Sequence, residues 1–210
     1  MKKIYLNPLP VRIWHWINTI SFLVLIVTGI QIRYRDIVNL FSFELATDIH
    51  DWFGFILIGN FFIWLVYYLF TGKIRIYIPP IKHPVNLIKG IITQSKYYGY
   101  GIFVGEPNPH HPTPDNKFNP QQQLAYLMIM AFLIPAQIVT GLLLWDPKLF
   151  SKWIALLGGI RIIDTIHVLI FIFFGSFLFV HLYLATLGRT PLAHIKTMIT
   201  GYEEEEEHSH

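Results

Sequence analysis

Residues 163–187 read IDTIHVLIFIFFGSFLFVHLYLATL, and this stretch decides the fold. A helix needs about 20 mainly apolar residues to cross a hydrocarbon core about 30 Å thick, and this segment exceeds that length. It contains two histidines, His167 and His181. Ionisable side chains inside a membrane span are costly and usually functional. The stretch therefore predicts a transmembrane helix that carries a site.

Three further segments have the same apolar character, and none of the four has Lys, Arg, Asp or Glu near its middle; they cover about 11–32, 49–70 and 124–145. The composition agrees, because 53% of the 210 residues are hydrophobic and only 14% are charged, against about 25% in soluble domains. Mean hydropathy is +0.46. We predict an all-α membrane protein, a bundle of four transmembrane helices formed by one domain over 1–201, with an acidic flexible tail over 202–210.

Cysteine is absent, whereas histidine occurs ten times. The lack of cysteine excludes disulfides, cysteine-bound zinc, iron–sulfur clusters and haem attached through cysteine. Histidine is then the strong transition-metal ligand available to the chain. The formal net charge of +3 is too small to indicate nucleic acid as a partner.

Lysine and arginine predict the orientation, because loops rich in these residues stay in the cytoplasm. The N-terminal arm, the connection 71–123 and the tail hold eleven of the 16 Lys and Arg residues, Arg189 among them, and the other two loops hold five. Both termini and the long loop between the second and third helices are therefore expected in the cytoplasm. Within that loop, 74–94 mixes apolar and basic residues, and we expect part of it to form a helix at the membrane surface. The Pro-, His- and Asn-rich segment 106–120 predicts a loop that is either ordered or covered by a partner.

Helix geometry relates His167 to His181. Fourteen residues at a rise of 1.5 Å separate them by about 21 Å along the axis, and fourteen steps of about 100° return to within about 40° of the same face. One histidine therefore lies near each side of the membrane. Given the orientation, His15 of the first span is level with His181, and His50 of the second span is level with His167.

Two pairs of facing imidazoles in a helical bundle predict two haems b, each held by two histidines. The inner haem takes His15 and His181, and the outer haem takes His50 and His167. A structural zinc site is the weaker interpretation, because it needs four ligands that converge on one point. The alternative for any single histidine is a hydrogen-bonded residue at the membrane interface.

Small and basic residues near these histidines have two interpretations each. Gly29, Gly54 and Gly175 let a flat macrocycle approach a helix, and close helix packing explains them equally well. Arg12 lies three residues before His15 and hence on the same face. It either pairs with a haem propionate or extends to lipid phosphates.

Besides the spacing of His167 and His181, the chain contains four further motifs, at residues 10–17 (PVRIWHWI), 27–29 (VTG), 119–126 (NPQQQLAY) and 195–202 (IKTMITGY). Together these resemble the cytochrome b subunits of nickel–iron hydrogenases, the gamma subunit of respiratory formate dehydrogenase and the cytochrome b subunits of thiosulfate reductase, which are prokaryotic cytochrome b561-like proteins. The resemblance covers nearly the whole chain.

The resemblance implies a di-haem cytochrome b in the prokaryotic cytoplasmic membrane, with the same four histidine ligands. It implies electron transfer between a partner oxidoreductase, such as the iron–sulfur subunit of a hydrogenase, formate dehydrogenase or sulfur-compound reductase, and a menaquinone or ubiquinone pool. The quinone would bind near the inner haem at the start of the third helix, where Asn119 matches the quinone-contacting Asn and Gln121 stands in place of a glycine. Asn119 followed by Pro120 is also a typical helix cap, which is compatible with a quinone contact.

Two other functions fit the same residues. A stand-alone cytochrome b561-type quinone-coupled oxidoreductase needs the same helices and haems but no partner. A haem-free membrane anchor would use its histidines for lipid or quinone. His110 and His111 either deliver protons to a reduced quinone or are ordinary loop residues, and neither His83 nor His194 suggests a role.

Overall fold

The computed structural model describes residues 2–113, 116–188 and 190–205. Outside the described residues lie Arg189 and residues 206–210 of the predicted tail, which include His208 and His210. The chain is mostly helical. Its elements in order are β1 (Lys2–Tyr5), α1 (Leu9–Arg33), α2 (Phe43–Phe70), the 3₁₀ helix η1 (Lys73–Tyr77), α3 (Pro84–Gly99), the 3₁₀ helix η2 (Gly101–Val104), α4 (Pro120–Met128), the π-helix η3 (Ile129–Leu133), α5 (Ile134–Trp145), α6 (Ser151–Leu156), α7 (Ile160–Thr186), α8 (Ala193–Thr200) and β2 (Tyr202–Glu205).

Four helices are long and apolar enough to cross a membrane, which confirms the four predicted spans; they cover Leu9–Arg33, Phe43–Phe70, Pro120–Trp145 and Ile160–Thr186. The second begins six residues earlier than predicted. There, the Ser42 hydroxyl accepts a hydrogen bond from the Leu45 amide at 3.2 Å and caps the helix. The 28 residues of α2 extend about 42 Å, which is longer than the hydrocarbon core is thick.

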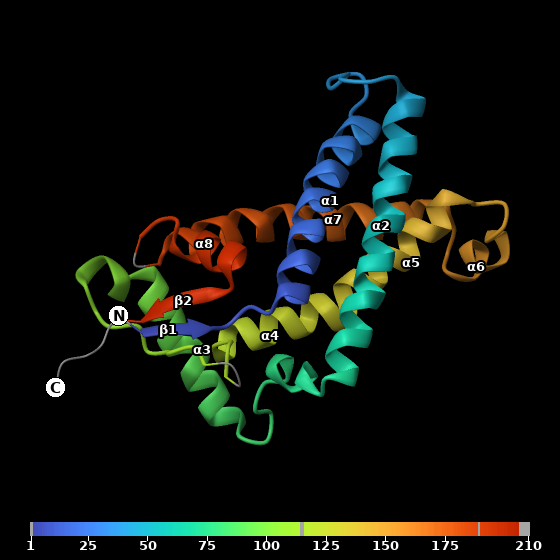
Figure 1. The fold of residues 1–210 in the computed structure, drawn as a ribbon. Helices are drawn as coiled ribbons and strands as arrows, with labels where there is room; N and C mark the ends of the chain where they lie inside the picture. Colours follow the sequence, from blue (N-terminus) through green and yellow to red (C-terminus); the bar gives the residue numbers. More distant parts are fainter. Residues whose placement is uncertain (1, 114–115, 189, 206–210) are drawn as a thin grey trace.

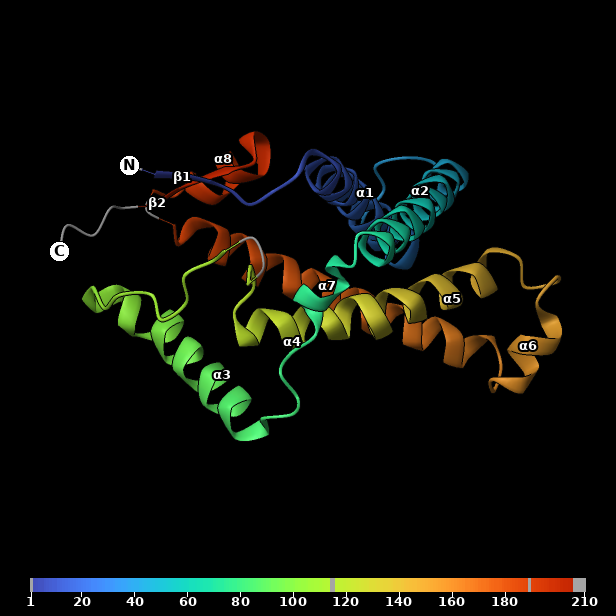
Figure 2. The same ribbon diagram turned by 60° about the horizontal axis from the view of Figure 1, so that its bottom comes forward.

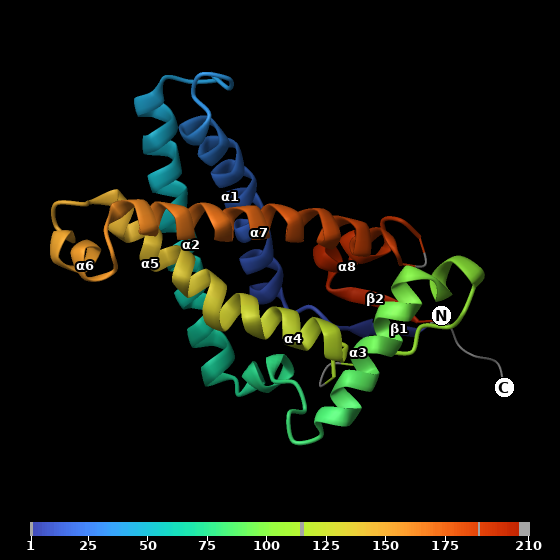
Figure 3. The same ribbon diagram turned by 180° about the vertical axis from the view of Figure 1, so that it is seen from behind.

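The spans form two helical hairpins that cross each other (Figures 1 and 3). Helices α1 and α2 make one hairpin, and the continuous segment α4–η3–α5 packs with α7 to make the other. A buried cluster joins them, and Trp64 of α2, Ile134 of α5 and Phe174 of α7 belong to it. Both described chain ends, α3 and α8 lie at one end of the molecule, and α6 lies at the far end (Figure 2).

The third span contains a π-helical turn, which sequence reasoning did not predict. Pro135 has no backbone N–H and its ring would clash with the carbonyl four residues earlier in a regular α-helix. The turn η3, over Ile129–Leu133, directly precedes this proline and inserts the wider i+5 bonding pattern. The span therefore stays continuous despite its proline.

The loop between α2 and α4 contains a helix over part of the stretch 74–94, as predicted. The chain forms η1, a turn through Pro79 and Pro80, and then α3 from Pro84 to Gly99. A residue that precedes proline avoids helical geometry, whereas proline itself suits the first turn of a helix. Helix α3 exposes an apolar row, Val85, Ile88 and Ile92, at helical spacing. A location of this row at the membrane surface stays a prediction.

The first residues of the predicted tail form a strand. Tyr202–Glu205 (β2) pairs antiparallel with Lys2–Tyr5 (β1), and the register sets basic residues of β1 opposite acidic residues of β2. Gly201 makes the turn into β2 with φ of +89°, and its carbonyl accepts bonds from the amides of Leu6 and Asn7 at 3.0 and 3.1 Å. A Cβ at Gly201 would lie only 2.8 Å from the Asn7 carbonyl oxygen. We call β1, β2, Gly201 and α8 the terminal clasp.

Candidate functional site

The structure brings His15 of α1 next to His181 of α7. Their ring centroids are 6.2 Å apart and the rings are tilted by 47°. Phe177, one turn before His181, stacks on that imidazole at 5.7 Å, and Trp16 meets His15 edge-on at 5.3 Å. Aromatic side chains therefore surround this pair, which we call the inner pair.

A second pair of histidines forms another level of the bundle, nearer the start of α7. His50 of α2 and His167 of α7 have ring centroids 6.4 Å apart, with 64° between the rings. Each pair joins one hairpin to the other. Between the two levels, Phe174 of α7 packs edge-on against Phe22 of α1 with centroids 5.3 Å apart. We call His50 and His167 the outer pair.

Both separations fit two imidazoles bound to one metal ion. Centroids are then roughly 6 Å apart, because a metal–nitrogen bond is about 2.0 Å long and each ring centre lies about 1 Å farther. Within the described residues, no group of three or more His, Cys, Asp or Glu side chains could hold a metal ion. A haem iron needs only two ligands from the protein, because the macrocycle supplies the others. The donor set therefore suits haem better than zinc.

Threonine hydroxyls hold both histidines of the outer pair. Thr28 Oγ1 lies 2.9 Å from His50 Nδ1, and Thr140 Oγ1 lies 2.9 Å from His167 Nδ1. Each hydroxyl donates to the carbonyl four residues earlier, at 2.8 Å, so its oxygen accepts from the imidazole. Nδ1 therefore carries the proton, and Nε2 keeps the lone pair that a metal needs.

Glycines next to these threonines leave room for the outer rings. A Cβ on Gly29 would lie 3.4 Å from His50 Cε1, and one on Gly141 would lie 3.3 Å from His167 Cε1. Cβ atoms built at Gly54 and Gly175 would meet nothing within 4 Å among the described residues. Gly29 thus leaves room for the ring of His50 on the neighbouring helix, whereas Gly54 and Gly175 leave the surfaces of their own helices uncovered.

The inner pair lies beside basic side chains. Arg12 donates from Nη1 to the carbonyl of Ile199 in α8, and within the described residues its buried Nε has no hydrogen-bond partner. Lys117 donates to Asn7 Oδ1 and lies within electrostatic range of His15. Burial lowers the pKa of Lys117 to about 8, although the carboxylate of Glu203 acts in the opposite direction and raises this pKa. Either cation suits a carboxylate ligand.

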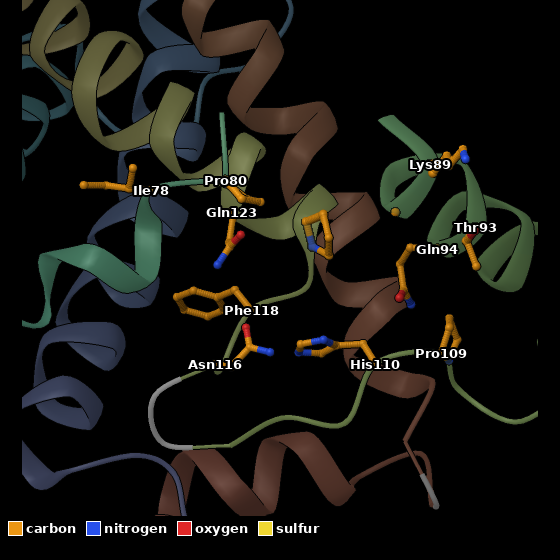
Figure 4. A pocket seen from close by; sticks show the side chains of 12 residues that line it. Ile78, Pro80, Lys89, Thr93, Gln94, Pro109, His110, Asn116, Phe118 and Gln123 are labelled. Carbon is orange, nitrogen blue, oxygen red and sulfur yellow. The ribbon is translucent and has the colours of Figure 1, made fainter. Parts of the chain in front are cut away.

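A pocket of about 590 Å³ opens at the same end, between α3, the loop before α4, and the start of α4 (Figure 4). The volume is in the range of small-molecule sites. Phe118, Gln94, Gln123 and Lys89 line it, and His110 points into the same region as Asn116. Burial lowers the pKa of His110, and within the described residues its Nε2 has no partner.

Asn119 and Gln121 border this pocket but do not line it. Asn119 caps α4, since its side chain accepts from the Gln122 amide at 2.9 Å, and its amide donates to the Tyr98 hydroxyl at 3.2 Å. Gln121 accepts from Ser95 of α3 at 3.4 Å. Both residues therefore hold α4 against α3, and the pocket wall is made by their neighbours.

Sequence reasoning missed Thr28 and Thr140 as partners of the outer histidines. A signal was available, because the chain repeats Ile-Val-Thr-Gly at 26–29 and at 138–141. Each copy places its threonine and glycine against a histidine of the next helix in the same hairpin. An internal repeat in two apolar helices would have indicated two equivalent positions.

Comparisons with known proteins agree with this architecture. A family model described as prokaryotic cytochrome b561 matches residues 7–201. The chain is 33% identical over 208 residues to "Putative cytochrome YdhU" of Escherichia coli (strain K12), covering 96% of this chain and 75% of that protein. It is 26% identical over 233 residues to "Probable Ni/Fe-hydrogenase B-type cytochrome subunit" of Rhizobium leguminosarum bv. viciae, covering 95% of this chain and 88% of that one. No solved structure gives a significant match.

Proposed function

This chain belongs to the prokaryotic cytochrome b561 family, and from that membership we propose that it is a di-haem subunit that transfers electrons between a partner oxidoreductase and quinone. The chain is a multi-pass membrane cytochrome b with a role in electron transfer, and its family implies haem b.

The single observation that carries the proposal is the pair of facing histidine rings at each of two levels, with centroids 6.2 and 6.4 Å apart. Along α7 the levels are about 21 Å apart, which is most of the hydrocarbon thickness. Two cofactors at these levels would connect the two membrane faces. A single site could not.

Each haem b, when bound, takes up and releases one electron through its iron. His15 and His181 would hold the inner haem, and His50 and His167 the outer one. Thr28 and Thr140 keep the outer imidazoles in the tautomer that binds iron. Arg12, with its free Nε, is suited to a propionate of the inner haem.

Quinone is the proposed partner of the inner level. The pocket beside Phe118 is large enough for a quinone head group and combines apolar walls with amide and basic groups. Asn119 and Gln121 would act by fixing the α3–α4 wall of this pocket. His110 stands in the pocket as a candidate proton donor for a reduced quinone.

The redox partner is proposed from the descriptions of the relatives. One relative is described as a hydrogenase cytochrome subunit, so we propose a catalytic subunit of a hydrogenase, formate dehydrogenase or sulfur-compound reductase, with iron–sulfur chemistry on that subunit. We further propose the prokaryotic cytoplasmic membrane as the location. The described chain ends and α3 share one end of the molecule (Figure 1), and the basic residues of the termini and of the α2–α4 loop would keep them in the cytoplasm.

Haem content of the purified chain tests the ligand assignment. We expect two haems b per chain and loss of one of them in His167→Ala. His194→Ala is the matched control and should retain both haems, because His194 belongs to neither pair and its Nδ1 lies 3.3 Å from the Ala185 carbonyl. Two haems in His167→Ala would refute the assignment, and a colourless wild-type protein would favour a haem-free anchor.

Co-purification tests the partner. A complex isolated from native membranes should contain a second redox polypeptide in constant ratio to this chain. If the cytochrome is isolated alone and still reacts with quinol, the stand-alone cytochrome b561-type oxidoreductase is the correct function instead.

A further inference from the structure

The two histidine pairs differ in what holds Nδ1. Both outer histidines have a threonine at 2.9 Å. Within the described residues, Nδ1 of the inner His15 is buried without a hydrogen-bond partner. We propose that Thr28 and Thr140 are positioning residues that make the outer haem the low-potential haem of the chain. This inference rests on the proposed histidine ligation.

The direction of each hydrogen bond follows from the helix backbone. Thr28 Oγ1 lies 2.8 Å from the Val24 carbonyl, and Thr140 Oγ1 lies 2.8 Å from the Ala136 carbonyl. A hydroxyl has one proton, and a carbonyl can only accept. The proton is therefore used in the helix, and the oxygen accepts from Nδ1–H of His50 or His167.

A second contact gives the same tautomer for His167. The side-chain amide nitrogen of Gln137 lies 3.2 Å from His167 Nε2. An amide NH₂ group only donates, so Nε2 is the acceptor. The contact agrees with a proton on Nδ1, and iron bound at Nε2 would take the place of the Gln137 amide.

The hydrogen bond on Nδ1–H makes the imidazole a stronger electron donor to a metal at Nε2. A stronger donor stabilises the more positive, oxidised iron and so lowers the reduction potential. Both outer ligands receive this effect, whereas His15 receives none within the described residues. The hydrogen bonds therefore favour the lower potential at the outer level.

Nearby charges act in the same direction. Lys117 lies within electrostatic range of His15, and a cation favours reduced iron. At the outer level Asp164 lies within range of His167, with its charge partly compensated by Arg33 at 3.2 Å. His50 and His167 would then hold the haem of lower potential, and His15 and His181 the haem of higher potential. An electron supplied by the proposed redox partner would pass from the outer to the inner level with favourable free energy.

Redox titration of the full-length protein, followed in the b-type α-band, tests the inference. We expect two components, and His50→Ala should remove the one of lower potential. Thr28→Val and Thr140→Val should each move this component to higher potential, and the double variant should move it farther. The other component should not shift in any of the three.

Two controls separate the hydroxyl from packing. Thr28→Ser and Thr140→Ser keep the oxygen and should titrate like the wild type. Thr19→Val removes a hydroxyl from the same helix that donates only to the His15 carbonyl, at 2.9 Å, and should leave both components in place. Electron paramagnetic resonance should show the signal of only the outer haem altered in the valine variants.

Several outcomes would overturn the inference. It fails if the valine variants leave the lower component unmoved, or shift both components equally, or if His50→Ala removes the higher one. If a valine variant loses one haem, retention of that haem in the serine variant supports the positioning role, and loss from both contradicts it. A wild type without two haems refutes the ligation itself, which is a different failure.

Discussion

The outer and inner histidine pairs have nearly equal ring separations, 6.4 and 6.2 Å, yet they are built differently. Each outer histidine is oriented by a threonine from its own hairpin, Thr28 for His50 and Thr140 for His167. The inner pair is surrounded by Phe177 and Trp16 and lies beside the end where the terminal clasp and the α2–α4 loop meet. The outer ligands can therefore be oriented within each hairpin, whereas the inner environment needs the whole chain.

Removing one inner ligand is the largest test of this difference. His181→Ala should lose the inner haem, about half of the total, and retain the outer one, because both outer ligands and both threonines are intact. Haem content and the remaining redox component measure this. Loss of both haems would mean that the levels are not independent.

Filling the space beside an outer ring should have the next largest effect. Gly141→Val places a side chain against His167, where a Cβ alone would lie 3.3 Å from Cε1. Overpacking of this kind costs about 1–3 kcal/mol, so retention of the outer haem should fall while the inner haem stays. Gly59→Val is the control, since a Cβ there would meet no atom of the described residues within 4 Å. Equal loss in both variants would contradict the local explanation.

Straining the terminal clasp should affect the inner end alone. Gly201→Ala puts a side chain at φ of +89° and brings Cβ to 2.8 Å from the Asn7 carbonyl oxygen. We expect the free energy of unfolding to fall by about 1–3 kcal/mol. Proteolysis at the N-terminus should become faster, and the spectrum of the inner haem should change. An altered outer haem would show that the two ends are coupled.

The smallest expected effect is a pH dependence. Lys117 has a pKa of about 8, lowered by burial. Below pH 8 its positive charge favours reduced iron at the inner level, and above pH 8 that charge is lost, so the inner potential should fall as pH rises through 8. Lys117→Met should abolish this step. Titrations at pH 7 and pH 9 compare the variant with the wild type, and a step that persists assigns it to another group.

Local patterns account for what could be predicted. The four spans follow from the length of the apolar segments. The separation of His167 and His181 along α7 and their position on one face follow from helix geometry. The early start of α2 was missed because its first turn has a polar cap and Glu44, which a hydropathy pattern excludes. The π-turn before Pro135 was missed because an apolar span is predicted from its length and composition, which do not show the hydrogen-bonding pattern within the helix.

In the candidate site, too, only the features with a local sequence pattern could be predicted. Residues that bear the chemistry, such as His50, were accessible because ionisable groups are rare in apolar spans. Thr28 and Thr140 were not, because threonine is common in such helices and bonds its own backbone. Asn119 was predicted as a cap, and the structure adds that its amide also holds Tyr98 of α3.

The sequence by itself determined the helices, the heights of the four histidines and the absence of cysteine ligands. Those properties depend on composition and on the fixed rise of a helix. Only the tertiary structure decided that the hairpins cross, that Thr28 and Thr140 orient the outer histidines, and that Lys117 lies near His15. These depend on contacts between helices distant in sequence, which no local pattern encodes.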